Sequence, residues 1–208
     1  ATALMLQAAE DYTTLVLCPK NLESMWQEHL DAYGVEGARV VPYSMADKVL
    51  PDLKLYKLVI CDESHNLRND TTRAHEAISE YVRRNSSKVL LLTATPYNLA
   101  FADVANQLAL YIEEDEDLGI VPSAAMAKDH TLADKVDGKT NTLVAFKRSE
   151  ESDDWRRLMS DHLVRRTRSF IKKSAKKKLV TLTDGTVQER EYLQFADGTE
   201  FFFPTRVP

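Results

Sequence analysis

Two adjacent acidic residues at the end of an apolar run are the most informative feature of this sequence. Residues 58–61 are apolar, and Asp62, Glu63 and, two positions further, His65 follow them. Such a run is typical of a buried strand in a parallel sheet, where ligand chemistry lies just beyond the carboxyl ends of the strands. One carboxylate there could hold a hydrated Mg²⁺ ion while the other orients or deprotonates a water molecule. Because the same residues also fit a solvated turn, the other motifs have to decide between the two interpretations.

Two more apolar runs end in residues that could serve such a site. Residues 88–92 lead into Thr93 and Thr95, whose hydroxyls we expect beside the acidic strand, within hydrogen-bonding reach of His65. Residues 13–18 lead through Pro19 and Lys20 into a helical segment. Backbone N–H groups at a helix start, together with the positive charge of Lys20, would suit a phosphate group.

The elements that must position these residues alternate along the first half of the chain. Strands are predicted over residues 13–18, 38–41, 57–61 and 88–93. Apolar residues recur with helical spacing over residues 22–33 and 74–82, and Asn21 and Gly34 are candidates for the start and end of the first of these helices. Residues 1–11 also look helical. Strands that alternate with helices predict right-handed crossovers and an α/β fold, a three-layer αβα lobe with a mainly parallel sheet.

Composition narrows the class of protein. Hydrophobic residues make up 44% and charged residues 28% of the 208 positions, which is typical of a globular domain. No apolar run approaches the roughly 20 residues that span a bilayer, and no secretory leader is visible, so we expect a cytoplasmic protein without a membrane partner. Cys18 and Cys61 lie in apolar runs and are predicted to be core thiols rather than metal ligands.

The chain changes character after residue 111. Residues 112–152 start with an acidic stretch and are only weakly periodic, whereas residues 155–163 again predict a short amphipathic helix. Eight basic residues and no acidic one follow between Arg165 and Lys178, although the net charge of the chain is −5. This run could contact a nucleic-acid backbone, dock another domain or form a solvated helix. We therefore expect a core over residues 1–111 and, over residues 112–208, an extension of the same lobe with a basic helix and a β-rich end.

In this order and spacing, the segments resemble the motifs of superfamily 2 helicases and translocases, and most closely those of Swi/Snf-type, DEAH-like ATPases. Ser64 stands where the DEAH box usually has alanine. The residues that match are, for motif Ia, Pro19, Lys20 and Trp26; for the DEAH box, Asp62, Glu63 and His65; for motif III, Thr93 and Thr95; and for a double-arginine segment near the end of the first lobe, Arg165, Arg166 and Arg168.

The resemblance implies one RecA-like ATPase lobe that uses ATP and Mg²⁺ and moves on DNA, with RNA as the alternative. It implies that Asp62 positions Mg²⁺ through water and that Glu63 polarises the attacking water. It also implies that His65, Thr93 and Thr95 couple hydrolysis to movement. For the remaining residues we expect nucleic-acid contacts at Pro19, Lys20, Lys172 and Lys173, and either DNA contacts or docking of the second RecA-like lobe of the parent chain at Arg165, Arg166 and Arg168.

The Walker A loop of this family, Gly-x-Gly-Lys-Thr, has no counterpart ahead of the first helix. The resemblance therefore implies that the chain starts just past this loop and that it is inactive alone. Gly138-Lys139-Thr140 is no substitute, because position 133 is Ala where the motif needs Gly, and no strand precedes it. Two other classes stay open: a non-catalytic DNA-binding or assembly module with the same fold, and a different nucleoside triphosphatase that uses the same acid pair.

Overall fold

The computed structural model describes residues 2–94, 101–164, 175–181, 186–194 and 198–202. The chain divides into two compact units, Ala1–Met159 and Ser160–Pro208, and each is considered by itself. The functional division expected after residue 111 stays a prediction. Within the described ranges, no helix combines the length and the apolar character that a membrane crossing requires.

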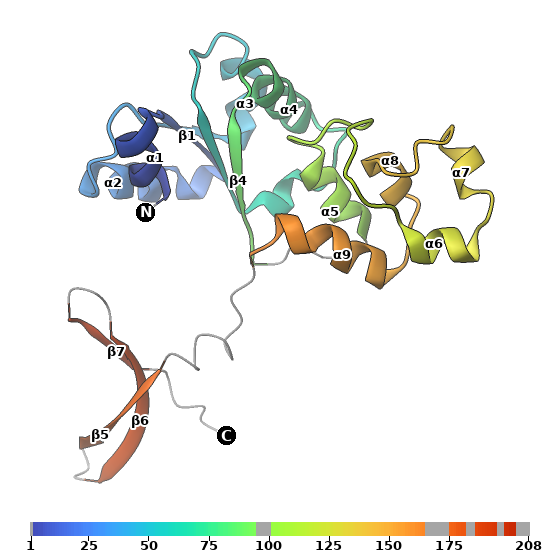
Figure 1. The fold of residues 1–208 in the computed structure, drawn as a ribbon. Coiled ribbons are helices and arrows are strands. Elements are labelled where there is room, and N and C mark those ends of the chain that lie inside the picture. The colour runs from blue at the N-terminus through green and yellow to red at the C-terminus, as the bar shows by residue number, and fades with distance from the viewer. Residues whose placement is uncertain (1, 95–100, 165–174, 182–185, 195–197, 203–208) are drawn as a thin grey trace. The chain divides into compact units, whose positions relative to one another are not determined.

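A four-stranded parallel sheet forms the centre of the first unit (Figure 1). Its strands are β1 (Thr14–Cys18), β2 (Arg39–Pro42), β3 (Leu58–Asp62) and β4 (Lys88–Leu92), in the order β2-β1-β3-β4. Each strand lies within one residue of its predicted bounds. The register pairs Leu17 of β1 with Cys61 of β3, and Asp62 of β3 with Leu92 of β4, so the carboxyl ends of the three strands meet at one edge of the sheet.

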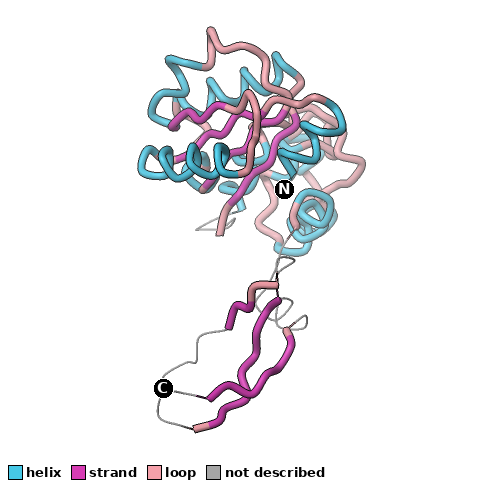
Figure 2. The backbone as a smooth tube through the Cα atoms, turned by 90° about the vertical axis from the view of Figure 1, so that its left-hand side faces the viewer, coloured by secondary structure: helices cyan, strands magenta, loops and turns pink. Residues whose placement is uncertain are grey.

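Helices cover both faces of this sheet (Figure 2). Because successive side chains of a strand point to opposite faces, Leu15 packs on one side in a cluster with Ile78, and Val16 packs on the other in a cluster with Leu30. The helices that contribute to the first cluster are α3 (Ala46–Val49) and α4 (Arg73–Asn85), and those that contribute to the second are α1 (Thr2–Glu10) and α2 (Glu23–Ala32). The predicted α/β class, with helices on both sides of a parallel sheet, is confirmed.

A side-chain cap starts α4, and of the two helix ends predicted from the sequence, both for α2, one is confirmed and the other is wrong. Thr72 caps α4, because its hydroxyl accepts a hydrogen bond from the backbone N–H of His75 at 3.2 Å. Gly34 follows α2 with a φ of 62°, the left-handed conformation that commonly ends a helix. The prediction of Asn21 as the cap of α2 is wrong. It lies inside the 3₁₀ turn η1 (Lys20–Leu22), which leads directly into the helix, and Leu22 occupies the cap position without a side-chain hydrogen bond.

Short helices occupy the weakly periodic region and the segments that flank it. They are α5 (Phe101–Leu108), α6 (Ser123–Lys128), α7 (Leu132–Lys135), α8 (Leu143–Phe146) and α9 (Ser152–His162). Trp155 of α9 is only 1% exposed and stacks on Phe101, with 5.6 Å between the ring centroids. The amphipathic helix predicted over residues 155–163 therefore buries its first residue in the core. The helices α6, α7 and α8 are four to six residues long, and such short helices leave little periodicity in a sequence.

The second unit contains a three-stranded antiparallel sheet. Its strands are β5 (Lys176–Thr181), β6 (Val187–Gln194) and β7 (Glu200–Phe202), in the order β5-β6-β7. The last three lysines of the basic run therefore begin a strand and do not continue a helix. Two of these lysines form ion pairs within the sheet: Lys177 with Glu189 of the adjacent strand β6 at 3.0 Å, and Lys178 with Glu200 of β7 at 2.8 Å.

Candidate active site

The acid pair lies on a sharp turn directly after β3. Asp62 is the last residue of the strand, and Glu63 adopts a left-handed conformation with φ 50° and ψ 48°. A residue with a Cβ atom pays roughly 1–2 kcal/mol to adopt this conformation. Local hydrogen bonds offset this strain: the backbone N–H of Glu63 donates to Oδ1 of Asp62, and both the backbone N–H and Nδ2 of Asn66 donate to the carbonyl oxygen of Glu63, each at 2.9 Å. The 3₁₀ turn η3 (Ser64–Leu67) follows. We call residues 62–66 the acid turn.

Two aromatic residues from other elements hold Asp62 in place. Nε1 of Trp26, in α2, donates a hydrogen bond to Oδ2 of Asp62 at 2.7 Å. The hydroxyl of Tyr43, in the 3₁₀ turn η2 (Tyr43–Met45), donates to the backbone carbonyl of Asp62 at 2.6 Å. Burial, and then the negative charges of the groups around it, raise the pKa of Tyr43, so the phenol keeps the proton that it donates. Together with the bond from the backbone N–H of Glu63 to Oδ1, the bond from Trp26 anchors the carboxylate at both oxygens.

The sequence did not identify Trp26 and Tyr43 as partners of Asp62. Trp26 was expected on an apolar helix face, and its ring does pack against the sheet, but its polar edge reaches the acid turn. The one available signal was general: a partly buried indole N–H needs an acceptor. No spacing rule indicates which of the acceptors along the chain it would find.

His65 connects the acid turn to the end of β4. Its Nδ1 atom lies 3.3 Å from Oγ1 of Thr93 and 3.2 Å from Oε2 of Glu63. The expected hydrogen bond between His65 and Thr93 is therefore present. Whether Nδ1 donates or accepts depends on the tautomer, but in either state the imidazole contacts the second acid and the neighbouring strand end together.

The acid turn is suited to hold a hydrated Mg²⁺ ion through a single carboxylate. It is not suited to enclose a metal ion with protein ligands alone. Among the described residues, no three His, Cys, Asp or Glu side chains gather into a group that could hold a metal ion. The ionised carboxylate of Asp62 has about four lone-pair positions, and the two hydrogen bonds above use two of them. Mg²⁺ commonly keeps several waters and binds through one or two carboxylates plus the phosphates of a substrate.

The two cysteines beside the acid turn are not suited to bind a metal or to act as nucleophiles. Both are buried and free, as the sequence predicted. Burial, together with the nearby charge of Asp62, raises the pKa of Cys18 to about 11, and burial raises that of Cys61 to about 12. Both thiols therefore stay protonated near neutral pH, whereas metal binding and nucleophilic attack need the thiolate.

Of the remaining predicted site residues, the structure describes Pro19 and Lys20. Pro19 and Lys20 follow β1 at the same edge of the sheet, where the exposed side chain of Lys20 forms an ion pair with Glu23 in the first turn of α2. Lys139, of the Gly-Lys-Thr segment, lies after α7 and pairs with Asp115 at 3.7 Å. The predicted site residues that lie outside the described residues are Thr95, Arg165, Arg166, Arg168, Lys172 and Lys173.

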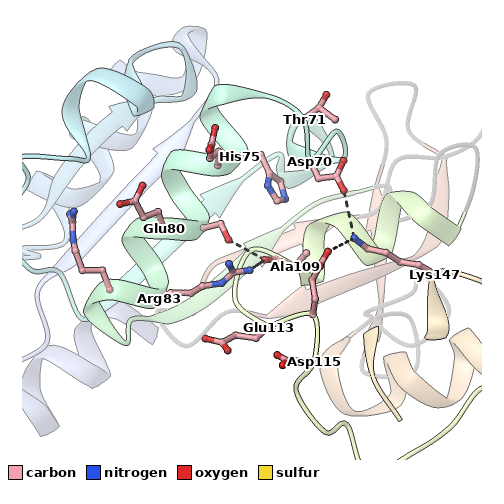
Figure 3. A pocket seen from close by; sticks show the side chains of 13 residues that line it. Asp70, Thr71, His75, Glu80, Arg83, Ala109, Glu113, Asp115 and Lys147 are labelled. Atoms are coloured by element: carbon pink, nitrogen blue, oxygen red, sulfur yellow. Dashed lines mark hydrogen bonds and ion pairs between the residues drawn. The ribbon is translucent and has the colours of Figure 1, made fainter. Parts of the chain in front are cut away.

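A separate open pocket of about 970 Å³ lies beside α4 (Figure 3). Both carboxylates and cationic side chains line it, and Lys147 bridges two of the acids, with Nζ 3.6 Å from Asp70 and 3.5 Å from Glu114. None of the residues from Asp62 to Asn66 lines it. The acid turn and this pocket are therefore different sites.

Comparison with known proteins identifies the fold. No protein-family model matches the chain, and no curated protein matches it in sequence. Among solved structures, the chain is similar to the Sulfolobus solfataricus SWI2/SNF2 ATPase core in complex with dsDNA, with a TM-score of 0.51 and 18% sequence identity. The match covers 79% of this chain and 36% of that one, so the chain spans about a third of that ATPase core. The first unit thus has the fold of a RecA-like lobe.

Proposed function

We propose that this chain is the first ATPase lobe of a Swi/Snf-type DNA translocase, in which ATP hydrolysis drives movement on nucleic acid. The observation that carries the proposal is the acid turn itself: two carboxylates at a strand tip, the first anchored at both oxygens and the second in contact with His65. The fold similarity to a SWI2/SNF2 core that was solved with dsDNA supports DNA as the partner.

Three residues of the acid turn then have a role in phosphoryl transfer. Asp62 would hold the Mg²⁺ ion of MgATP through water, and the bound ion would neutralise charge that develops on the phosphates. Glu63 would orient the attacking water and accept its proton as the water oxygen bonds to the γ-phosphorus, while the bond from that phosphorus to the bridging oxygen breaks and ADP leaves. His65 contacts both Glu63 and Thr93, so a change at the acid turn would reach the end of β4 through its ring.

The lobe needs a phosphate-binding loop, and we propose that a Walker A loop precedes Ala1 in the parent protein. The exposure of β4 supports this. It is an edge strand of the described sheet, and its residues from Val89 to Leu92 are only partly buried, whereas β1 and β3 are buried over almost their whole length. A further parallel strand, leading into the loop, would pair with this edge and cover it.

Two groups of residues would contact nucleic acid: those that follow the carboxyl end of β1, and the basic run between Arg165 and Lys178. Pro19 and Lys20 follow β1, and the exposed ammonium group of Lys20 is free to exchange Glu23 for a phosphate, because an exposed ion pair is worth little. Lys172 and Lys173 are proposed to bind phosphates. Arg165, Arg166 and Arg168 are proposed to dock the second RecA-like lobe, with DNA phosphates as the alternative.

Turnover assays on two proteins test the proposal. The 208-residue chain should hydrolyse no ATP, because it lacks the Walker A lysine, whereas the full-length protein should hydrolyse ATP and do so faster with DNA.

In the full-length protein, Glu63→Gln should lower turnover roughly 10²-fold or more and leave nucleotide binding intact, as expected for the loss of a general base. Glu80→Gln, an exposed acid of α4, is the matched control. Unchanged turnover in Glu63→Gln would refute the role of Glu63. Full-length protein that binds DNA without hydrolysing ATP would support the non-catalytic alternative.

A further inference from the structure

Trp26 connects two parts of the lobe that are far apart in sequence. It is the fourth residue of α2, and its partly buried ring packs against the cluster that contains Val16 and Ile60 of the sheet. From there its indole N–H reaches Oδ2 of Asp62, 36 positions later in the chain, at 2.7 Å.

The two oxygens of Asp62 are held in different ways. Oδ1 accepts from the backbone N–H of the next residue, Glu63, so this bond moves with the acid turn. Oδ2 accepts from Trp26, which belongs to a helix packed on the sheet. Of these two bonds, only the one from Trp26 fixes the plane of the carboxylate relative to the body of the lobe. A hydrogen bond to an ionised acceptor is also roughly twice as strong as one between neutral groups.

We propose that Trp26 is a positioning residue of the metal site: its N–H orients the Asp62 carboxylate for the hydrated Mg²⁺ ion of the nucleotide. This inference rests on the proposed function. Carboxylates that hold metals are in turn fixed by hydrogen bonds from outer residues, and loss of such a partner typically lowers metal affinity or activity 10–100-fold.

A purely structural role of Trp26 predicts a different result. If the bond only satisfies a partly buried indole N–H, its loss lowers the stability of the lobe and leaves the affinity for Mg²⁺ unchanged. The second tryptophan of the chain provides a matched control. Nε1 of Trp155 donates to the backbone carbonyl of Ser149 at 2.8 Å, in the buried contact of α8 and α9, so Trp155→Phe removes an indole N–H from the same lobe without touching Asp62.

The experiment compares Trp26→Phe and Trp155→Phe in the full-length protein. Two quantities are titrated with Mg²⁺: ATP turnover, and the binding of a fluorescent ATP analogue, which is also measured in EDTA. For Trp26→Phe we expect the half-saturating Mg²⁺ concentration to rise roughly tenfold in both titrations, with analogue binding in EDTA unchanged. For Trp155→Phe we expect both Mg²⁺ titrations to match those of the unmodified protein. Only the stability of this variant should fall.

Each result decides the matter. Trp26→Phe with unchanged Mg²⁺ titrations would overturn the positioning role while the proposed function stands. Unmodified protein that does not hydrolyse ATP would overturn the proposed function and, with it, the role of Trp26. If Trp26→Phe does not fold, site-specific incorporation of 3-benzothienylalanine at position 26 replaces the N–H with sulfur at nearly the same ring shape. The same tenfold shift is then expected, and its absence would overturn the inference.

Discussion

The hydroxyl of Ser64 donates a hydrogen bond to Oε1 of Gln107 at 2.8 Å, and both side chains are buried. This bond joins the acid turn to α5. A second bond from α5 runs from Nδ2 of Asn106 to the carbonyl of Arg68, just after η3, also at 2.8 Å. The resemblance to DEAH-like ATPases had made Ser64 the one departure within the box, because alanine is usual there. In this chain the extra hydroxyl has a dedicated partner across the fold.

The pair should therefore contribute to stability as a unit. Ser64→Ala or Gln107→Leu alone removes one partner and leaves the other buried without it, at about 1–3 kcal/mol in the free energy of unfolding. The double variant removes both polar groups, so its loss should be clearly smaller than the sum of the two single losses. Urea unfolding of the four proteins measures this coupling. Additive losses would show that the bond contributes nothing specific.

The left-handed conformation of Glu63 should limit the stability of the lobe. Glycine adopts a φ of 50° without Cβ strain, so Glu63→Gly should raise the free energy of unfolding by about 0.5–1 kcal/mol, after allowance for the greater freedom of glycine in the unfolded chain. Ser86→Gly is the matched control, because Ser86 ends α4 with a φ of 49°, away from the acid turn. Both variants should be stabilised, and only Glu63→Gly should lose ATP turnover in the full-length protein. A destabilised Glu63→Gly beside a stabilised Ser86→Gly would mean that the contact of Glu63 with His65 outweighs the strain.

The raised thiol pKa values predict both chemical inertness and a loss of stability in alkali. At pH 8, Cys18 and Cys61 of the folded chain should react with a thiol reagent far more slowly than those of the urea-unfolded chain, because burial keeps them protonated.

The same raised pKa values link the stability of the fold to pH. A thiol whose pKa is higher in the folded state than in the unfolded state contributes its full stability below the unfolded pKa, and this contribution is lost as pH rises through the folded pKa. Stability should therefore fall from about pH 9 toward about pH 11 for Cys18 and about pH 12 for Cys61. Cys61→Ala should make that fall shallower, and an unchanged fall would assign it to other groups, such as the Tyr43 phenol.

Charge reversal in the basic run should separate its two proposed roles. On duplex DNA of random sequence, the slope of log affinity against log salt shrinks by about 0.9 for each phosphate contact that is lost. Lys172→Glu with Lys173→Glu should therefore shrink the slope by about 1.8 in the full-length protein, measured by fluorescence anisotropy. Reversal of Arg165, Arg166 and Arg168 should leave the slope unchanged and lower the DNA stimulation of ATP turnover. A smaller slope in the arginine variant would instead assign these residues to DNA.

The sequence by itself determined the parts of this lobe that depend on local pattern. The four parallel strands, the helices α2, α4 and α9, and the acids at the tip of β3 could all be located in advance. Apolar runs and helical periodicity are properties of neighbouring residues, and polar residues that end parallel strands must meet at one edge of the sheet. The contact between His65 and Thr93 was foreseeable for that reason.

Only the tertiary structure decided what fixes the site. Trp26 meets Asp62 across 36 positions, and Ser64 meets Gln107 across 43. Such partners are chosen by the packing of whole helices on the sheet, so no spacing along the chain indicates them. The left-handed Glu63 was equally hidden, because no glycine or asparagine marks the turn, and the hydrogen bonds of Asp62 and Asn66 that hold it form only when the turn closes. Helices as short as those between residues 112 and 152 are marginal on their own, and long-range contacts hold two of them: Phe146 of α8 packs edge-on against the buried Trp155, and Asp154 accepts hydrogen bonds from the backbone N–H groups of Ala124 and Ala125 in α6.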